Sequence, residues 1–389
     1  MKILHIGQYY LLNYSYQENY LPNAMANSGR NEVIYLASNR FPSFYKIGKK
    51  DSKSFFDNSV YVIHTNMYFF RFLTILPAIT GIIRRYKPDL IFVHGYAYIK
   101  CIPLLLLCKI KNISICMDIH EDFQNSGMTR EAQSFLGKRR IEFYNYLNML
   151  YSIMFSKFIF QFYYVAPSVK EFCLKYLHLP KEKLQPLYLG FDYNMIDISE
   201  RQKIRKGIQS AYLIPDGKKI LITAGKFTKE KNLIALIKSV KILPTNIVLL
   251  IVGSIDSDVL NDMMKISIPK NVITCGWKDS KELLRYILAA DLAVYPGTQS
   301  VLWQQTVCLG TPSIFRYWHG IEYLGVGSNR FIHSGSPDEI AEAIETMVNS
   351  DIELREKREY SLKYGASMFD YRIEAERIIT DYKNSKYEN

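Results

Sequence analysis

Two lysines flank a short turn between an apolar run and an amphipathic segment. Ile220–Ala224 is apolar, Gly225 interrupts it, and apolar residues recur at helical spacing from Leu233 onward. Lys226 and Lys231 lie between this predicted strand and this predicted helix. Free backbone N–H groups and the positive end of a helix dipole favour an anion at such a place. The pattern predicts a clamp for a diphosphate, and a solvated surface pair of lysines is the alternative.

A second strand–loop–helix segment carries amides and small residues. A predicted strand ends at Tyr295, and Val301–Leu309 is predicted to form a helix that Gly310 stops. The loop between them supplies Gly297, Thr298, Gln299 and Ser300. Small side chains at a helix start let backbone N–H groups approach an anion or a sugar closely. We expect this loop to contact the same ligand as the lysine turn.

Polar groups also follow three predicted strands of the first half. Gln17 and Glu18 lie at the tip of the loop after the first strand, His94 follows the fourth, and Asp118–Asp122 follows the fifth. Within that last segment His120 is predicted to be functional, because its neighbours are charged and it is expected to face a cleft. His94 is either a hydrogen-bonded core residue or a catalytic group.

Alternating strands and helices are needed to position these groups. Apolar runs that end in small or polar residues recur along the chain, with helix-like stretches between most of them. The predicted strands are Lys2–Gly7, Val33–Ala37, Val60–His64, Leu90–His94, Ile113–Asp118, Phe158–Ala166, Ile220–Ala224, Ile247–Val252, Val272–Cys275, Leu292–Tyr295, Ser313–Arg316 and Arg330–Ile332. This order predicts an α/β protein with two doubly wound, Rossmann-like domains of parallel strands, which face each other across a cleft.

The chain, at 389 residues and 48% hydrophobic, is long enough for two or three domains. We expect an N-terminal domain over residues 1–192, a charged linker over 193–217 and a C-terminal domain over 218–350. Residues 351–389 are predicted to be a helical tail that returns to the first domain. The first and last parts of the chain would then share one body.

The formal net charge of +12 is concentrated in residues 1–192, which hold 23 Lys or Arg against 13 Asp or Glu. The sequence contains no nucleic-acid-binding motif, so we expect an anionic membrane surface as the partner of the basic half. Tyr68–Tyr86 and Arg139–Val165 mix aromatic, aliphatic and basic residues. Each is either an ordinary core helix or a segment that rests on the membrane.

The remaining composition indicates an intracellular protein. Six scattered cysteines lack paired metal spacing and are expected to be reduced. Met1–Gly7 is predicted to be a strand and not a signal peptide, and no apolar run is long enough to span a bilayer. The expected location is the cytoplasm, peripheral at the inner face of the membrane.

Five segments in order along the chain resemble the nucleotide-sugar glycosyltransferases of the GT-B fold, specifically glycosyltransferase family 4. The likeness extends over nearly the whole chain. The segments resemble the family's first loop and helix, fourth strand, domain exit, donor-phosphate turn and donor-sugar motif, and they are YQENYLPNAMANSGRNEV, PDLIFVHG, SVKEFCLKYLHLPKEKLQPLYLGFD, AGKFTKEKN and AADLAVYPGTQSVLWQQTVCLGTP.

The resemblance implies roles for several residues. Lys226 and Lys231 would hold the donor diphosphate, although the family carries arginine more often at the first position, and lysine lacks its bidentate fork. His120 falls where family members have a histidine near the reacting sugar. Residues at turns would contribute to the substrate site: Gly225, Gly253, Gly276 and Trp277. Of these, Gly253 and Gly276–Trp277 would hold the base.

The sequence departs from the family in the donor-sugar motif, which normally has two glutamates eight residues apart. The second falls on Gln305, and the first falls on Gly297 or, with a shifted loop, on Gln299. Alternatively, if Trp303 aligns with relatives that carry Trp-Glu-Gln, Gln304 is the residue that replaces the glutamate. Glutamine can hydrogen-bond a hydroxyl but supplies no charge to a developing oxocarbenium ion.

The expected function is therefore metal-independent, retaining transfer of a sugar from a nucleotide diphosphate to a hydroxyl of a cell-envelope glycan or lipid-linked acceptor. No cofactor is expected beyond the donor substrate. Gln17 and Glu18 would contact substrate in the first domain. The alternatives are a sugar-nucleotide epimerase or phosphorylase on the same fold, and a binding or scaffolding subunit that has lost turnover, which the glutamine departures favour.

Overall fold

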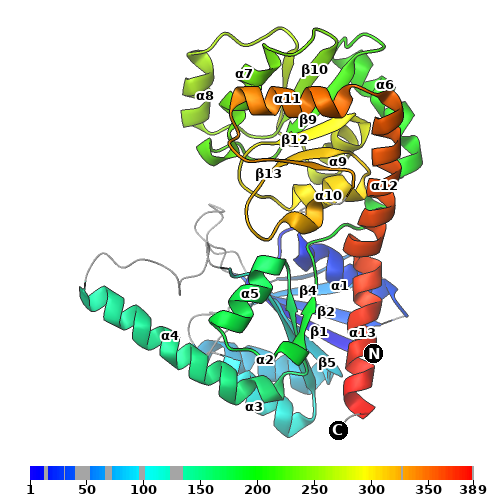
Figure 1. Cartoon of the computed structure of the whole chain (residues 1–389). Helices are drawn as coiled ribbons and strands as arrows, with labels where there is room; N and C mark the ends of the chain where they lie inside the picture. Colours follow the sequence, from blue (N-terminus) through cyan, green and yellow to red (C-terminus); the bar gives the residue numbers. More distant parts are fainter. Residues whose placement is uncertain are drawn as a thin grey trace. The chain divides into compact units, whose positions relative to one another are not determined.

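The structure is a computed structural model that describes residues 1–12, 16–29, 31–39, 53–65, 72–95, 101–122, 135–325 and 327–387. The chain forms two compact units (Figure 1). Unit 1 contains Met1–Leu189 and Tyr371–Asn389, and unit 2 contains Gly190–Asp370. Each unit has its own sheet and its own hydrophobic core.

Unit 1 is built on an eight-stranded sheet of order β3-β4-β2-β1-β5-β6-β7-β8. Its strands are β1 (Lys2–Gly7), β2 (Glu32–Ser38), β3 (Lys53–Asp57), β4 (Val60–Thr65), β5 (Leu90–Val93), β6 (Ser114–Ile119), β7 (Gln161–Tyr164) and β8 (Leu184–Pro186). The six predicted strands are confirmed. The prediction of an entirely parallel sheet is wrong at one edge, because β3 pairs antiparallel with β4. The two join through Asn58 in a left-handed conformation (φ 51°), which asparagine tolerates.

Six α-helices surround this sheet among the described residues of unit 1. They are α1 (Gln17–Asn27), α2 (Phe72–Tyr86), α3 (Ile102–Lys111), α4 (Phe135–Phe155), α5 (Pro167–Lys175) and α13 (Tyr371–Tyr387). The C-terminal α13 packs against α1, and the Tyr20 and Tyr371 rings lie 5.9 Å apart. The core consists of side chains such as Leu4, Ile91 and Met117 on the central strands, which are fully buried.

The two aromatic segments fold differently from each other. Part of Tyr68–Tyr86 forms α2, whereas Tyr68–Arg71 lie outside the described residues. Arg139–Val165 contributes most of α4, a 3-10 turn at Ser156–Phe158 and then β7. In the described part of the chain, no helix combines the length and the apolar character needed to cross a membrane.

Unit 2 has a six-stranded, parallel sheet of order β11-β10-β9-β12-β13-β14. Its strands are β9 (Lys219–Ala224), β10 (Ile247–Val252), β11 (Val272–Gly276), β12 (Leu292–Tyr295), β13 (Ser313–Arg316) and β14 (Arg330–Ile332). All six were predicted, and β10, β12, β13 and β14 have the predicted bounds. Its helices are α6 (Arg201–Ala211), α7 (Leu233–Val240), α8 (Ser257–Met264), α9 (Ser280–Ala289), α10 (Leu302–Cys308), α11 (Pro337–Val348) and α12 (Asp351–Phe369).

The strand order of each sheet reverses at one place. In unit 1, β1 lies between β2 and β5, and in unit 2, β9 lies between β10 and β12. The crossover connections leave opposite faces of the sheet at such a point, and a crevice opens at the carboxyl ends of the two strands. Ligands of doubly wound sheets bind there, so the exits of β1, β5 and β9 are the places to look for a site.

The unit boundaries differ from the expected ones in two respects. Residues 193–217, predicted as a linker, carry α6, which packs against α9 and whose Arg201 and Arg205 pair with Asp291 at 3.2 and 2.9 Å. The buried side chains on α6 are few, so its charged sequence resembles a linker. The predicted tail divides at Asp370, because α12 packs on α10 in unit 2 while α13 belongs to unit 1.

Candidate functional site

Lys231 joins the two donor-side segments predicted from the sequence. It ends a 3-10 turn, Lys229–Lys231, which follows β9. Its ammonium donates hydrogen bonds to the carbonyl oxygens of Thr298 at 2.6 Å and Gln299 at 2.9 Å, in the loop after β12. Burial lowers the pKa of Lys231 to about 8, against an opposing attraction to Glu230. The predicted meeting of the lysine turn and the amide loop is therefore present in unit 2.

Lys226 lies differently. Its side chain is 68% exposed, and its ammonium is 3.6 Å from the carboxylate of Asp256. An exposed pair of this kind contributes little to stability and is easily exchanged for another anion. Lys226 therefore matches the alternative of a solvated surface lysine, and only Lys231 of the pair contacts the loop.

Glycines allow the backbone segments of this site to approach one another. A Cβ on Gly297 would lie 2.2 Å from the carbonyl oxygen of Glu230 and 2.4 Å from the Cα of Lys231. A Cβ on Gly253 (φ 145°) would lie 1.8 Å from the carbonyl oxygen of Gly225. A glutamate at position 297 therefore has no room here, which gives a physical reason for the departure from the family at that position.

The glutamines of α10 are buried. Gln304 donates to the hydroxyl of Tyr323 at 2.8 Å, and Gln305 is fully buried. Gln299, in the loop, lies 3.5 Å from the same hydroxyl. The Oε1 atom of Gln304 is buried without a hydrogen-bond partner in the described part of the chain. Such an atom costs free energy until a donor reaches it.

The cavity at Lys231 is small. It measures about 10 Å³, which is room for about one water molecule. Its walls include residues from the lysine turn, the amide loop and α10: Lys231, Gly297, Thr298, Ser300 and Trp303. A sugar diphosphate does not fit inside it, so a ligand of Lys231 must bind outside this cavity or after the loop has moved. The proposed base-binding turn at Gly276 (φ 70°) leaves Trp277 71% exposed.

In unit 1, a buried carboxylate connects the strand-end histidines. Asp118, on β6, is fully buried. Its Oδ2 lies 2.9 Å from Nδ1 of His94, and its Oδ1 accepts a hydrogen bond from the backbone N–H of Gly95. Oδ1 also lies 3.4 Å from Nε2 of His120. The other ring nitrogen of His94, Nε2, lies 3.0 Å from Nδ1 of His5.

Charge in this cluster is concentrated at Asp118 and His120. Burial opposes ionisation of Asp118, but the charges of His120 and His94 and their hydrogen bonds hold its pKa well below the usual range. Burial lowers the pKa of His120, but the charge and hydrogen bond of Asp118 and the charge of Glu18 together outweigh this effect and raise it to about 9. Burial and the neighbouring His94 lower the pKa of His5. At neutral pH, His120 is an imidazolium ion at the partly exposed end of the cluster.

The first turn of α1 contributes to the same cluster. Gln17 is 1% exposed and donates to Oδ2 of Asp118 at 3.2 Å. Glu18 is half-buried and raises the pKa of His120 by its charge. The sequence predicts substrate contact for both, whereas the structure buries Gln17 against Asp118. In this conformation Gln17 therefore contacts Asp118, and Glu18 remains accessible.

Sequence reasoning placed Asp118 among the polar groups at a strand exit but gave it no role, and it did not single out His5. Both lie inside strands whose other residues are mostly apolar, and both are fully buried. A buried carboxylate must be paired, so Asp118 within the run SICMDI was a signal that a cation or donors lay nearby. The stacking of His5 on Phe92 and Tyr35 depends on neighbouring strands and left no signal in the sequence.

Residues 205–365 match the family model described as "Glycosyl transferases group 1". The matched segment lies within unit 2, and we call it the group 1 domain. This group 1 domain includes β9 to β14, and it contains Lys226, Lys231 and the loop to Ser300. A search of curated proteins gave no match to the sequence.

Solved structures resemble the whole chain, including the part that precedes the group 1 domain. HepE from Anabaena in complex with UDP gives a TM-score of 0.70 at 14% identity, over 99% of this chain and 100% of that chain. Sucrose-phosphate synthase from Thermosynechococcus elongatus gives 0.73 at 12% identity over 100% of both chains. WaaG, a glycosyltransferase involved in lipopolysaccharide biosynthesis, gives 0.65 at 14% identity over 98% and 100%. The chain has the GT-B fold predicted from its sequence.

Proposed function

We propose that the protein is a hexosyltransferase that moves a sugar from a nucleoside diphosphate to a hydroxyl of a lipid-linked cell-envelope glycan. The observation that carries this proposal is the contact between Lys231 and the loop after β12 within the group 1 domain. It combines a cation, exposed backbone at a strand exit and a topological switch point. HepE is described in complex with UDP and with UDP-glucose, so UDP-sugars are the first donors to test.

Lys231 would act on the leaving diphosphate. Two carbonyl groups accept hydrogen bonds from its ammonium in the structure. A diphosphate carries full negative charge and would compete with these carbonyls for the same cation. The charge that builds on the phosphate during bond cleavage would then be stabilised by a cation already in place. The exposed Lys226 would exchange Asp256 for the second phosphate.

His120 would bind the sugar or its phosphate through a hydrogen bond. Its imidazolium state argues against a role as a general base and against direct contact with a positively charged oxocarbenium ion. Asp118, which holds the imidazolium, would be a positioning residue. Glu18 near the same histidine is an accessible carboxylate for an acceptor hydroxyl.

Retention and metal independence complete the proposed mechanism. In the described part of the chain, no group of three or more His, Cys, Asp or Glu side chains is arranged to hold a metal ion. We assign front-face substitution, in which the departing phosphate takes the proton of the acceptor hydroxyl. The buried Gln305 would hydrogen-bond the donor, in place of the family's glutamate.

A membrane location is proposed from the surface of unit 1. On α4, Phe143, Tyr146, Ile153 and Met154 are exposed, whereas Asn148 on the same helix is fully buried. Apolar side chains facing outward over a buried polar residue favour an apolar partner surface. Arg139 and Arg140, which are also exposed, would favour anionic headgroups at the inner face of the cytoplasmic membrane.

A binding or scaffolding subunit is the second candidate. The small cavity at Lys231 and the glutamines in place of glutamates favour it. To separate these functions, purified protein is incubated with labelled nucleotide sugars, with and without an extract of lipid-phosphate acceptors. Label in the lipid fraction supports the transferase, conversion without acceptor supports an epimerase, and binding without reaction supports the scaffold. The same assay is run on Lys231→Ala. Its matched control is Lys229→Ala, which removes an exposed lysine from the same turn.

A further inference from the structure

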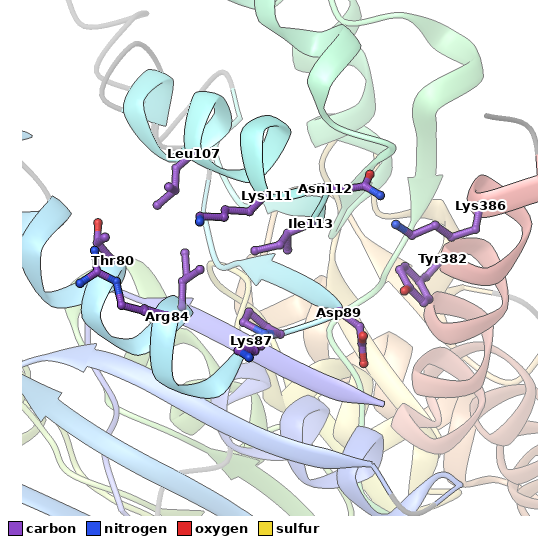
Figure 2. Close-up of a pocket in the computed structure, with 12 residues that line it drawn as sticks. Thr80, Arg84, Lys87, Asp89, Leu107, Lys111, Asn112, Ile113, Tyr382 and Lys386 are labelled. Atoms are coloured by element: carbon purple, nitrogen blue, oxygen red, sulfur yellow. The ribbon is translucent and has the colours of Figure 1, made fainter.

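One pocket lies away from both strand-end sites. It is in unit 1, between α2, α3 and α13, and has a volume of about 540 Å³ (Figure 2). Asp89 and Ile113, which line it, directly precede β5 and β6. His94 and Asp118 lie at the opposite, carboxyl ends of these two strands. The pocket is therefore at the other edge of the sheet from the histidine cluster.

Cationic side chains from four segments surround this pocket. Arg84 comes from α2, Lys87 from the turn before β5, Lys111 from α3 and Lys386 from α13, as the sticks in Figure 2 show. None of the four forms an ion pair with a carboxylate in the parts of the chain that the structure describes. Asp89 is the one carboxylate among the lining residues, and it accepts a hydrogen bond from the backbone N–H of Lys2.

Helix dipoles explain part of this charge but not all of it. Arg84 and Lys111 lie in the last turns of α2 and α3, where cations are favoured. Each helix C-terminus is equivalent to about half a negative charge. Two such ends together with Asp89 still leave an excess of about two positive charges in the pocket. An anion therefore complements the pocket better than water or a cation does.

The backbone at the pocket is unusual. Lys87 follows α2 with φ 51°, and Asn112 follows α3 with φ 54°. Asparagine adopts this left-handed conformation readily, whereas a lysine there is strained. The strain is retained in a residue whose side chain lines the pocket, and strain of this kind is concentrated at ligand sites.

An exposed apolar row adjoins the cations on α3. Leu107 and Lys111 line the pocket, while Leu106 and Ile110, one position earlier in each turn, are 45% and 78% exposed. Cations beside outward-facing aliphatic side chains match the boundary between headgroups and acyl chains. A soluble phosphate would contact only the cations, whereas a phospholipid would contact the cations with its phosphate and the apolar row with its acyl chains.

We propose that this pocket binds the phosphate of an anionic phospholipid headgroup and thereby holds unit 1 at a membrane surface. The inference rests on the membrane location in the proposed function, but not on turnover or on the donor site. Leu106 and Ile110 enter the bilayer interface, and the phosphate lies among Lys87, Lys111 and Lys386. The headgroup glycerol occupies the rest of the pocket.

The test is sedimentation with vesicles of phosphatidylcholine alone or mixed with phosphatidylglycerol. We expect wild-type protein to bind the anionic vesicles and Lys87→Ala/Lys111→Ala to bind them about 30-fold more weakly, since one lysine near an anionic surface contributes about fivefold. Lys175→Ala/Lys181→Ala removes two exposed lysines of unit 1 outside the pocket and is the control, expected within about twofold of wild type. Leu106→Ser/Ile110→Ser should also weaken binding.

Three results would overturn the inference: equal losses in the control and pocket variants, equal binding to neutral vesicles, or tight binding of free glycerol phosphate with no binding to vesicles. Calorimetry with UDP distinguishes this failure from that of the proposed function. The pocket variant should bind UDP as wild type does, because none of its substitutions lies in the group 1 domain.

Discussion

Donor binding should depend on pH through Lys231, because its ammonium is partly buried. The pKa of about 8 means that roughly nine tenths of the molecules carry the charge at pH 7 and roughly a tenth at pH 9. A nucleoside diphosphate is fully ionised over this range, since its last phosphate pKa is about 6. If the complex forms with the protonated lysine, the affinity for UDP falls about tenfold between pH 7 and pH 9.

The pH dependence of donor affinity has the opposite sign to the pH dependence that Lys231 gives to folding stability. The unfolded lysine keeps the ordinary pKa of 10.5, so the unfolded chain binds more protons between pH 8 and 10.5. The contribution of Lys231 to the stability of the unliganded protein therefore increases with pH in that window. Donor affinity decreases over the same window, so a general loss of structure cannot imitate the predicted pattern.

Isothermal titration calorimetry with UDP and GDP, in two buffers of different ionisation enthalpy, measures both affinity and proton uptake. We expect an uptake that approaches one proton at pH 9 in wild type. Lys231→Ala should bind about 10- to 150-fold more weakly at pH 7, the equivalent of a charge-assisted hydrogen bond of about 1.5–3 kcal/mol, with no slope. Lys229→Ala should keep the slope. A flat wild-type profile without proton uptake, or the same slope in Lys231→Ala, would refute the reasoning.

Other substitutions test the remaining parts of the site. His120→Ala should abolish turnover and retain UDP affinity in calorimetry. A wild-type rate would contradict a role of His120 in turnover and leave it a structural residue. Asp118→Asn should lower the pKa of His120 from about 9 toward 6.5, which NMR titration of the imidazole measures, and an unchanged titration would contradict the pairing. Gly297→Ala should displace the loop from Lys231 and weaken UDP binding at least tenfold, since its Cβ meets backbone atoms within 2.4 Å; unchanged binding would show that the loop adapts.

Strands with continuous apolar runs were predictable from the sequence. In β10 and β12 every residue is buried, so hydrophobicity marks their extent. β13 and β14 also have the expected bounds, although each contains half-buried residues. β3 was not predicted, since its pairing with β4 determines it and most of its side chains are exposed or half-buried. The buried Ile204 and Ile208 of α6 were hidden among charges.

The site was predictable where the chemistry is local and not where it depends on neighbouring strands. The lysine turn and the amide loop were each visible in sequence, and their contact followed from the strand order. The role of Asp118 was not visible, because its partners His94, Gly95 and Gln17 come from other elements. The burial of Gln17 follows from its place in the first turn of α1, where the sequence indicated a loop.

The most direct test of the account is a crystal structure of the protein soaked with a UDP-sugar. The account predicts diphosphate density within hydrogen-bonding distance of the Lys231 ammonium, with the carbonyl groups of Thr298 and Gln299 released from it. A sugar nucleotide bound elsewhere, with Lys231 still on both carbonyls, would contradict it.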